Sequence, residues 1–148
     1  MANFVLHPQL ARDCHVLGHF QLSLLLLLND SQYPWFVLVP QQPDVREIHH
    51  LGAADQQQLL RESSVLASAI ESAFKPDKLN IAALGNIVPQ LHIHHIARFR
   101  NDPAWPAPVW GKLPPVKYSS ERLRSVIECI SSELSGAGDI TFSRSGYF

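Results

Sequence analysis

Three of the chain's eight histidines fall within four positions, in the segment GNIVPQLHIHHIARF at residues 85–99. Most of this segment alternates in a way that is typical of a β-strand, in which successive side chains point to opposite faces. On such a strand Gln90, His92 and His94 would share one face, which would look outward or into a cleft. The apolar residues between them would share the other face with His95 and pack on the core. A row of one amide and two imidazoles is therefore the first candidate for chemistry.

Three interpretations of this polar row remain open. Histidines on a half-exposed strand can simply form hydrogen bonds with neighbours or solvent. A histidine pair with this spacing can also present two nitrogens to one metal ion, with a third ligand from His49, His50 or an acidic residue. The third interpretation is nucleophilic catalysis, in which one imidazole attacks phosphorus and its neighbour handles charge or protons on the leaving group. An imidazole suits that task because its ordinary pKa of about 6.5 leaves a large share unprotonated near neutral pH.

A proline-rich segment follows the histidine strand directly. Four prolines between residues 103 and 114 exclude regular helix or sheet through most of it, so an extended, ordered loop is expected. Trp105 and Trp110 would either cover the edge of the core or wall a pocket and stack on a substrate. Arg98 and Arg100 would form a positive rim for phosphates or remain solvated charges.

The elements that must hold this strand follow from hydrophobic periodicity and turn residues. Apolar runs bounded by Asn, Asp, Pro or Gly indicate strands, and apolar residues at helical spacing indicate amphipathic helices. The sequence predicts a short strand near residues 14–17, a hairpin within 20–39, a long helix from Asp55 to Pro76, a second antiparallel pair within 78–99, and a final helix from about Ser119 to Gly136. This order predicts an α+β fold, in which an antiparallel sheet carries one long helix and a C-terminal helix.

The long helix is expected to have a defined start and a defined core face. Asp55 stands where an N-cap would, and Gln58 three residues later completes a variant of the capping box. Leu66 and Ile70 keep to the face that would pack on the sheet, whereas Glu62 belongs to the set of polar residues expected mainly on the solvent side.

Length and composition limit the remaining possibilities. With 148 residues and 46% hydrophobic content, we expect one domain over residues 1–148, with a core at about 13–135 and a C-terminal tail at 136–148. Lys and Arg number 12 against 13 for Asp and Glu, so no strong field exists to gather a nucleic acid polymer. The apolar run at residues 22–28 is far shorter than the ~20 residues of a membrane-spanning helix, and no membrane partner is expected.

The cysteine pattern indicates the compartment. Cys14 and Cys129 have neither CxxC spacing nor a secretory leader before them. Both are therefore expected to be free thiols in a reducing compartment, which predicts a cytoplasmic protein.

The pattern G-N-x-V-x-Q-x-H-x-H-x-x-x-R at residues 85–98 resembles the signature of the histidine triad (HIT) superfamily of nucleotide hydrolases and transferases, whose strand reads H-x-H-x-H. The order LLLLLND, WFVLVPQQP and VREIHHL is also similar to the first hairpin of that family and the apolar-histidine segment that follows it. The resemblance covers roughly residues 20–98.

The resemblance implies a role for each member of the polar row. His92 falls on the middle histidine, which attacks the α-phosphate and becomes a nucleotidyl-phosphohistidine. His94 falls on the third histidine, which contacts the phosphate and helps the leaving group, and Gln90 falls on the first. The family members are mostly homodimers acting on nucleotides or dinucleotides, and no metal or other cofactor is implied.

The resemblance also implies a set of nucleotide-binding residues. Asn29 falls on the polar residue that contacts the ribose, His49 on a histidine near the nucleotide pocket, and Asn86 on a hydrogen-bond donor on the phosphate side. Arg98 joins this set as part of a positive rim for phosphates.

Gln90 departs from the family pattern, because an amide cannot become cationic or shuttle a proton. We therefore expect a hydrolase of phosphoester, phosphoanhydride or phosphoramidate bonds, or a nucleotidyl transferase, that works with one acid-base group fewer. A nucleotide-binding module with little or no turnover is the alternative, and a metal-binding domain is the third possibility. His95 replaces a usually apolar residue and is expected to be structural, with hydrogen bonds on the packed face.

Overall fold

The computed structural model describes residues 3–146, and its centre is a six-stranded sheet in which every pair of neighbouring strands is antiparallel. The strand order is β4-β5-β3-β2-β1-β6. In chain order the elements are α1 (Pro8–Asp13), β1 (Cys14–His19), β2 (Ser23–Leu28), β3 (Trp35–Pro40), a short 3-10 helix η1 (Ile48–His50), α2 (Ala53–Phe74), β4 (Lys78–Ala82), β5 (Ile93–Arg98), α3 (Ser120–Ser135) and β6 (Ser143–Arg144). The predicted α+β fold is confirmed. Residues 1–2 and 147–148 of the expected domain lie outside the described residues.

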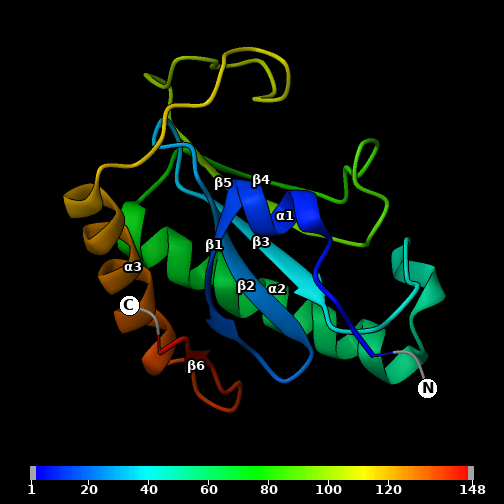
Figure 1. Cartoon of the computed structure of the whole chain (residues 1–148). Coiled ribbons are helices and arrows are strands. Elements are labelled where there is room, and N and C mark those ends of the chain that lie inside the picture. Colours follow the sequence, from blue (N-terminus) through cyan, green and yellow to red (C-terminus); the bar gives the residue numbers. More distant parts are fainter. Residues whose placement is uncertain (1–2, 147–148) are drawn as a thin grey trace.

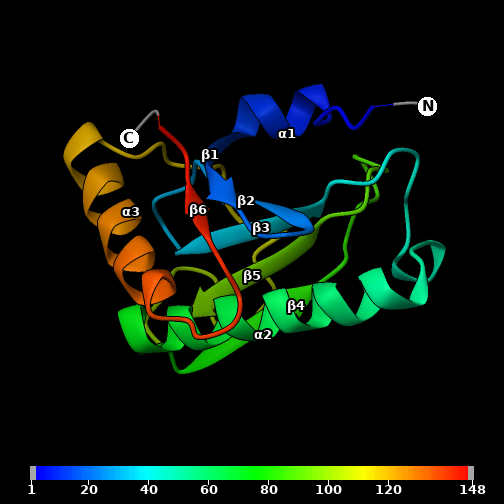
Figure 2. The same cartoon turned by 90° about the horizontal axis from the view of Figure 1, so that it is seen from below.

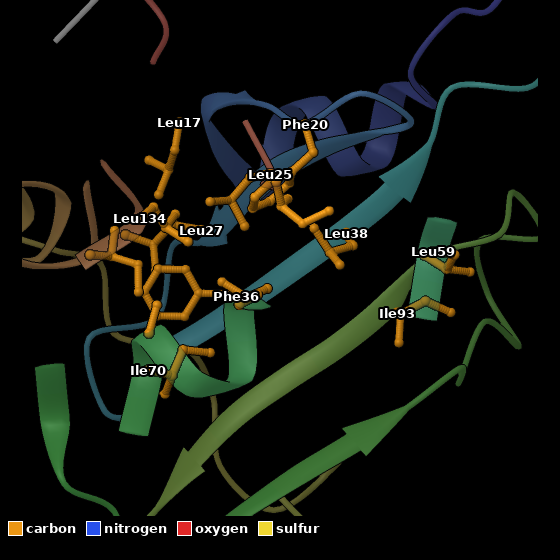
Figure 3. Close-up of a cluster of buried hydrophobic side chains, with 14 of the residues drawn as sticks. Leu17, Phe20, Leu25, Leu27, Phe36, Leu38, Leu59, Ile70, Ile93 and Leu134 are labelled. Atoms are coloured by element: carbon orange, nitrogen blue, oxygen red, sulfur yellow. The ribbon is translucent and has the colours of Figure 1, made fainter. Parts of the chain in front are cut away.

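The sheet separates two hydrophobic clusters. The long helix α2 packs on one face, and the short helix α1 lies on the opposite face (Figures 1 and 2). Alternate residues of β2 and β3 divide between the faces, as a period of two requires. In Figure 3, Phe36 of β3 lies with Ile70 of α2 and Leu134 of α3 in the main cluster, whereas Val37 belongs to the cluster beneath α1.

Helix α2 begins earlier than expected. Its N-cap is Gly52 and its first residue is Ala53, so the assignment of Asp55 as the N-cap is wrong. Asp55 instead lies in the first turn, where a carboxylate interacts favourably with the helix dipole. It also accepts a hydrogen bond from Gln42 (3.2 Å). An acidic residue therefore marks this helix start without capping it.

Glu62 was expected on the solvent side of α2, and this expectation is wrong. The residue is fully buried. Its carboxylate accepts the backbone N–H groups of Leu22 (2.9 Å) and Ser23 (3.0 Å) and the side-chain amide of Gln58 (2.8 Å). A buried charge is tolerated when it receives such bonds, so Glu62 fastens the start of β2 to the helix.

The two ends of the chain contain elements that the sequence pattern did not indicate. Helix α1 occupies the N-terminal lead-in, and β6 in the C-terminal tail pairs with the edge of β1. Gly18 of β1 allows this pairing, because a Cβ there would lie 2.2 Å from the carbonyl oxygen of Ser143. Helix α3 lies where the final helix was expected, with Ser119 as its N-cap and Gly136 as its C-cap. No helix in the described part of the chain is long and apolar enough to span a membrane.

Candidate active site

The histidine strand β5 lies inside the sheet, between β4 and β3. It begins at Ile93, so Gln90 and His92 precede the regular strand instead of belonging to it. The predicted division of faces is otherwise correct, because Ile93 is in the main core while His92 and His94 are on the other face. Their side chains do not point into solvent: the residues are 5% and 6% exposed, and their ring centroids are 4.9 Å apart.

His92 is held in one tautomer by the chain itself. Its Nδ1 lies 2.7 Å from the backbone oxygen of Gln90, and since a carbonyl oxygen only accepts, Nδ1 carries the proton. The lone pair of the neutral ring is therefore on Nε2. Burial lowers the pKa of His92, because a charged ring loses more solvation than a neutral one. The arrangement presents a neutral imidazole with an available nitrogen at neutral pH.

His94 differs from its neighbour because both of its nitrogens are occupied. The indole Nε1–H of Trp35, which can only donate, gives a hydrogen bond to Nδ1 (2.9 Å). The proton of His94 must then be on Nε2, which donates to the backbone oxygen of Leu84 (3.1 Å). Burial, and next the charge of His92, lower the pKa of His94 to about 4. The geometry makes His94 a neutral donor that holds the Leu84 carbonyl, with no free nitrogen for a leaving group.

A cavity of about 230 Å³ opens beside His92. Gly85 lies against the imidazole there: a Cβ at this position would be 3.1 Å from Cε1 of His92 and 2.7 Å from the backbone oxygen of Val88. Glycine therefore lets the loop pass close to the ring. The cavity is lined by Arg46, Glu47, Ala83, Gly85, Asn86, Pro89, Gln90, Leu91 and His92. The carboxylate of Glu47 is engaged by the backbone N–H of His50 at the start of η1. The remaining backbone, amide and guanidinium groups beside a neutral imidazole are suited to an anion such as a phosphate.

The side chain of Gln90 faces the N-terminal segment. Its Oε1 accepts the backbone N–H of His7 (2.9 Å), and its Nε2 donates to the backbone oxygen of Val5 (2.8 Å). Both ends of the amide are thus engaged by the chain.

The structure does not bring all of the expected nucleotide-binding residues to the cavity. Asn86 lines it. Asn29, at the end of β2, accepts the backbone N–H of Tyr118 (3.0 Å), and His49 lies exposed in η1 with its ring against His50 (4.6 Å between centroids). Neither of these two lines the cavity beside His92.

Arg98 is not a positive rim, so that expectation is wrong. The residue is 1% exposed, and its guanidinium binds both carboxylate oxygens of Asp102 (2.8 and 3.1 Å). Its remaining bonds go to Asn80 (2.8 Å) and the backbone oxygen of Ala107 (2.9 Å). A bidentate pair of this kind is a strong structural contact. Arg98 therefore anchors the loop after β5 and cannot also face a phosphate.

The two tryptophans of the proline-rich loop have different neighbours. Trp110 packs edge-on against His94 (5.1 Å) and Trp35 (5.7 Å), so it walls the histidine side of the sheet. Trp105 lies 5.7 Å from the guanidinium of Arg98. The loop therefore covers the sheet face beyond His94.

His95 has the structural role that was expected. It is fully buried on the core side of β5. Its Nε2 lies 2.7 Å from the hydroxyl of Ser63 on α2, and its Nδ1 lies 3.0 Å from the backbone oxygen of Ile93. Burial lowers its pKa to about 4, so the ring is neutral and ties the sheet to the helix.

Three contributors to this site were missed by sequence reasoning. Arg46 follows a loop with no periodicity, Trp35 reads simply as a core residue, and His7 is a single histidine in the N-terminal lead-in. Among residues 3–146, no three His, Cys, Asp or Glu side chains form a group that could hold a metal ion. The metal interpretation therefore lacks its third ligand in the described part of the chain.

Comparison with known proteins agrees with the fold. Residues 9–101 match the family model described as the HIT domain. A histidine triad protein from Marinobacter aquaeolei VT8 is 49% identical, with a TM-score of 0.89 and coverage of 93% of this chain and 100% of that one.

Two further solved structures are similar over nearly the same length. A histidine triad protein from Bradyrhizobium japonicum is 42% identical (TM-score 0.88; 89% and 98% of the two chains), and one from Sinorhizobium meliloti 1021 is 40% identical (TM-score 0.87; 88% and 97%). A search of curated proteins gave no match. The HIT-domain match and these relatives show that the chain belongs to the histidine triad (HIT) family.

Proposed function

We propose that this protein is a nucleotide hydrolase or nucleotidyl transferase that cleaves a phosphoester, phosphoanhydride or phosphoramidate bond through a covalent intermediate on His92. The observation that supports this most strongly is the 2.7 Å contact between Nδ1 of His92 and the Gln90 carbonyl, which leaves Nε2 unprotonated beside the cavity. In the first step the Nε2–phosphorus bond forms and the bond to the leaving group breaks. In the second, water or an acceptor hydroxyl attacks phosphorus and the imidazole departs.

The hydrogen bond to the carbonyl also favours the reaction energetically. Attack through Nε2 places positive charge on the ring of His92, and the carbonyl dipole at Nδ1 stabilises that charge as it develops. Arg46 and Asn86, which line the same cavity, are proposed to bind the phosphoryl oxygens. We assign His94 to positioning, because it holds the backbone beside Gly85 through the Leu84 carbonyl.

The proposed site does not extend to every residue first considered. Asn29, His49 and Arg98 lie away from the cavity or are engaged elsewhere, so we leave them out of it. The second candidate function, a nucleotide-binding module with little turnover, is favoured by one observation. Neither the amide of Gln90 nor the engaged ring of His94 offers a proton to a leaving group.

We also propose that the protein is a homodimer, as the family resemblance implies. Strand β4 lies at the edge of the sheet, and an edge strand can pair with its own copy about a two-fold axis. Beside it Ile48, Leu60 and Ile81 are 43%, 68% and 49% exposed around an apolar hollow of about 550 Å³. The dimer is tested by measuring the molar mass of the parent and of Ile81→Lys by light scattering. A parent that is monomeric rejects the proposed dimer.

The function is tested with adenosine nucleotides that differ in the group attached to phosphorus, scored for binding by calorimetry and for turnover by product analysis. The parent should cleave at least one of them, and His92→Ala should lose turnover while remaining folded. His19→Ala is the matched control, since His19 is exposed and its Nδ1 lies 3.0 Å from the carbonyl oxygen of the adjacent Phe20, away from the cavity beside His92. Cleavage by His92→Ala at the parent rate rejects the mechanism. Binding without turnover in the parent supports the binding module instead.

A further inference from the structure

Gln90 connects the nucleophile to the N-terminal segment. Its backbone oxygen binds Nδ1 of His92 (2.7 Å), while its side-chain amide binds the backbone of Val5 (2.8 Å) and His7 (2.9 Å). These residues are more than 80 positions away in sequence. The paired bonds, one donated and one accepted, tie residues 5–7 to Gln90, which lines the cavity together with His92. An imidazole at position 90 could not reproduce this side-by-side pair of one donor and one acceptor.

The N-terminal segment is also anchored on its other side. Leu10 of α1 is 6% exposed and belongs to the hydrophobic cluster that covers the His92 face of the sheet, together with Val88 and Ile96. Phe4 and Leu6 pack against the same cluster. Figure 2 shows α1 on the side of the sheet away from α2. His7 is therefore held between a hydrophobic anchor and the Gln90 bonds.

The chain binds the Nδ1 atom of the His7 ring, whereas Nε2 has no hydrogen-bond partner among residues 3–146. His7 is the N-cap of α1, and its Nδ1 accepts the backbone N–H of Gln9 (3.1 Å). In the neutral ring the proton is then on Nε2. Ser, Thr, Asp and Asn are the preferred residues for capping, so the cap alone does not explain an imidazole here.

His7 and His92 also interact through charge. Burial is the main cause of the lowered pKa of His92, and the positive charge of His7 lowers it further. The effect opposes the hydrogen bond to Gln90, which favours the protonated ring. The other ionisable groups around His92 are His94 on β5 and Arg46 and Glu47 across the cavity.

We propose that His7 supplies the second imidazole of the site, donating from Nε2 to the phosphoryl oxygens bound at His92, and that Gln90 is the positioning residue that holds it there. The inference deepens the proposed function and rests on it for the identity of the substrate. It explains the amide at position 90: the first imidazole of the triad pattern is replaced by one carried on another segment. Gln90→His should consequently release residues 5–7 and weaken phosphate binding.

His7→Asn separates chemistry from structure, because asparagine is a better N-cap than histidine and leaves the backbone bonds to Gln90 in place. His19→Asn is the matched control. The first readout is the titration of histidine ring signals by NMR in the full chain. Removing the positive neighbour should raise the pKa of His92 in His7→Asn, while His19→Asn should leave it unchanged. A His92 titration that is the same in parent and His7→Asn overturns the proposal.

The second readout is binding of inorganic phosphate, measured by calorimetry. His7→Asn should weaken it roughly tenfold, the usual effect of losing one hydrogen bond to a charged group, and His19→Asn should not. Gln90→Leu should cause a similar loss, and the double variant should bind no more weakly than either single one, because the two residues act together. Additive losses in the double variant overturn the positioning role of Gln90.

These measurements need no turnover, so the inference and the proposed function can fail separately. A parent that binds phosphate through His7 yet forms no adduct with any nucleotide rejects the hydrolase and retains the inference. A parent that binds no phosphate at millimolar concentration, or His7→Asn with the parent affinity, overturns the inference whatever the nucleotide result.

Discussion

Replacing His95 with leucine should flatten the dependence of stability on pH. His95 is fully buried, and burial lowers its pKa in the folded chain from 6.5 to about 4. Between these values the unfolded chain binds a proton that the folded chain does not. Stability therefore falls as the pH drops from about 6.5 to about 4 and does not fall further through this group below that.

The size of the effect follows from that window. Each pH unit within this window lowers the free energy of unfolding by about 1.4 kcal/mol. The full window therefore lowers it by about 3.5 kcal/mol, and the part from pH 6.5 to 5 lowers it by about 2 kcal/mol. His95→Leu also removes the hydrogen bond to Ser63 (2.7 Å), which lowers stability at pH 7 by about 1 kcal/mol. The variant should thus start less stable and lose less on acidification.

The measurement is urea unfolding at pH 7, 6 and 5 (values within the range where histidine titrates), followed by tryptophan fluorescence. The parent should lose about 2 kcal/mol more than His95→Leu between the two ends of this range. Ser63→Ala serves as the control, because it removes the same hydrogen bond but leaves the buried imidazole. For Ser63→Ala, the free energy of unfolding plotted against pH should run parallel to that of the parent. Parallel curves for the parent and His95→Leu would refute the reasoning.

Three further changes test other parts of the account. Gly85→Ala should reduce turnover by about 10²-fold, as a 1 Å displacement can, because the added methyl group would meet the ring of His92 at 3.1 Å; steady-state kinetics measures this. Glu62→Gln should lower the free energy of unfolding by about 2 kcal/mol, as measured by urea unfolding. The two carboxylate oxygens of Glu62 each accept a backbone N–H group, and an amide has only one oxygen to accept them. Arg98→Met should cost about 3–5 kcal/mol because it leaves the Asp102 carboxylate buried without its ion-pair partner, which calorimetric melting would detect.

The sheet and the two long helices could be predicted because their signals are local. Strands β2 and β3 are continuous apolar runs separated by turn residues, and α3 has a serine cap and a glycine stop. The short elements α1 and β6 could not be predicted in this way. They form only because Leu10 and Gly18 meet distant parts of the sheet, and neither contact leaves a periodic pattern in the sequence.

The shared face of His92 and His94 could be predicted from the sequence, and the surroundings of the two rings could not. Alternation along the strand places His92 and His94 on one face, but the same face can be open or covered. It is covered here by α1 and Trp110. Burial of Glu62 and Arg98 likewise depends on partners far along the chain or in a loop, so both polar residues read as solvent-facing from the sequence alone.

The proposed covalent intermediate on His92 can be trapped chemically. The parent is mixed in excess with an adenosine nucleotide that has a good leaving group, quenched in alkali within the first turnover, and digested for mass spectrometry. An alkali-stable, acid-labile nucleotidyl group is expected on His92 of the parent and of His19→Ala, and is expected to be absent from His92→Ala. Nucleotide cleavage with no modified His92, or with the group on another residue, would contradict it.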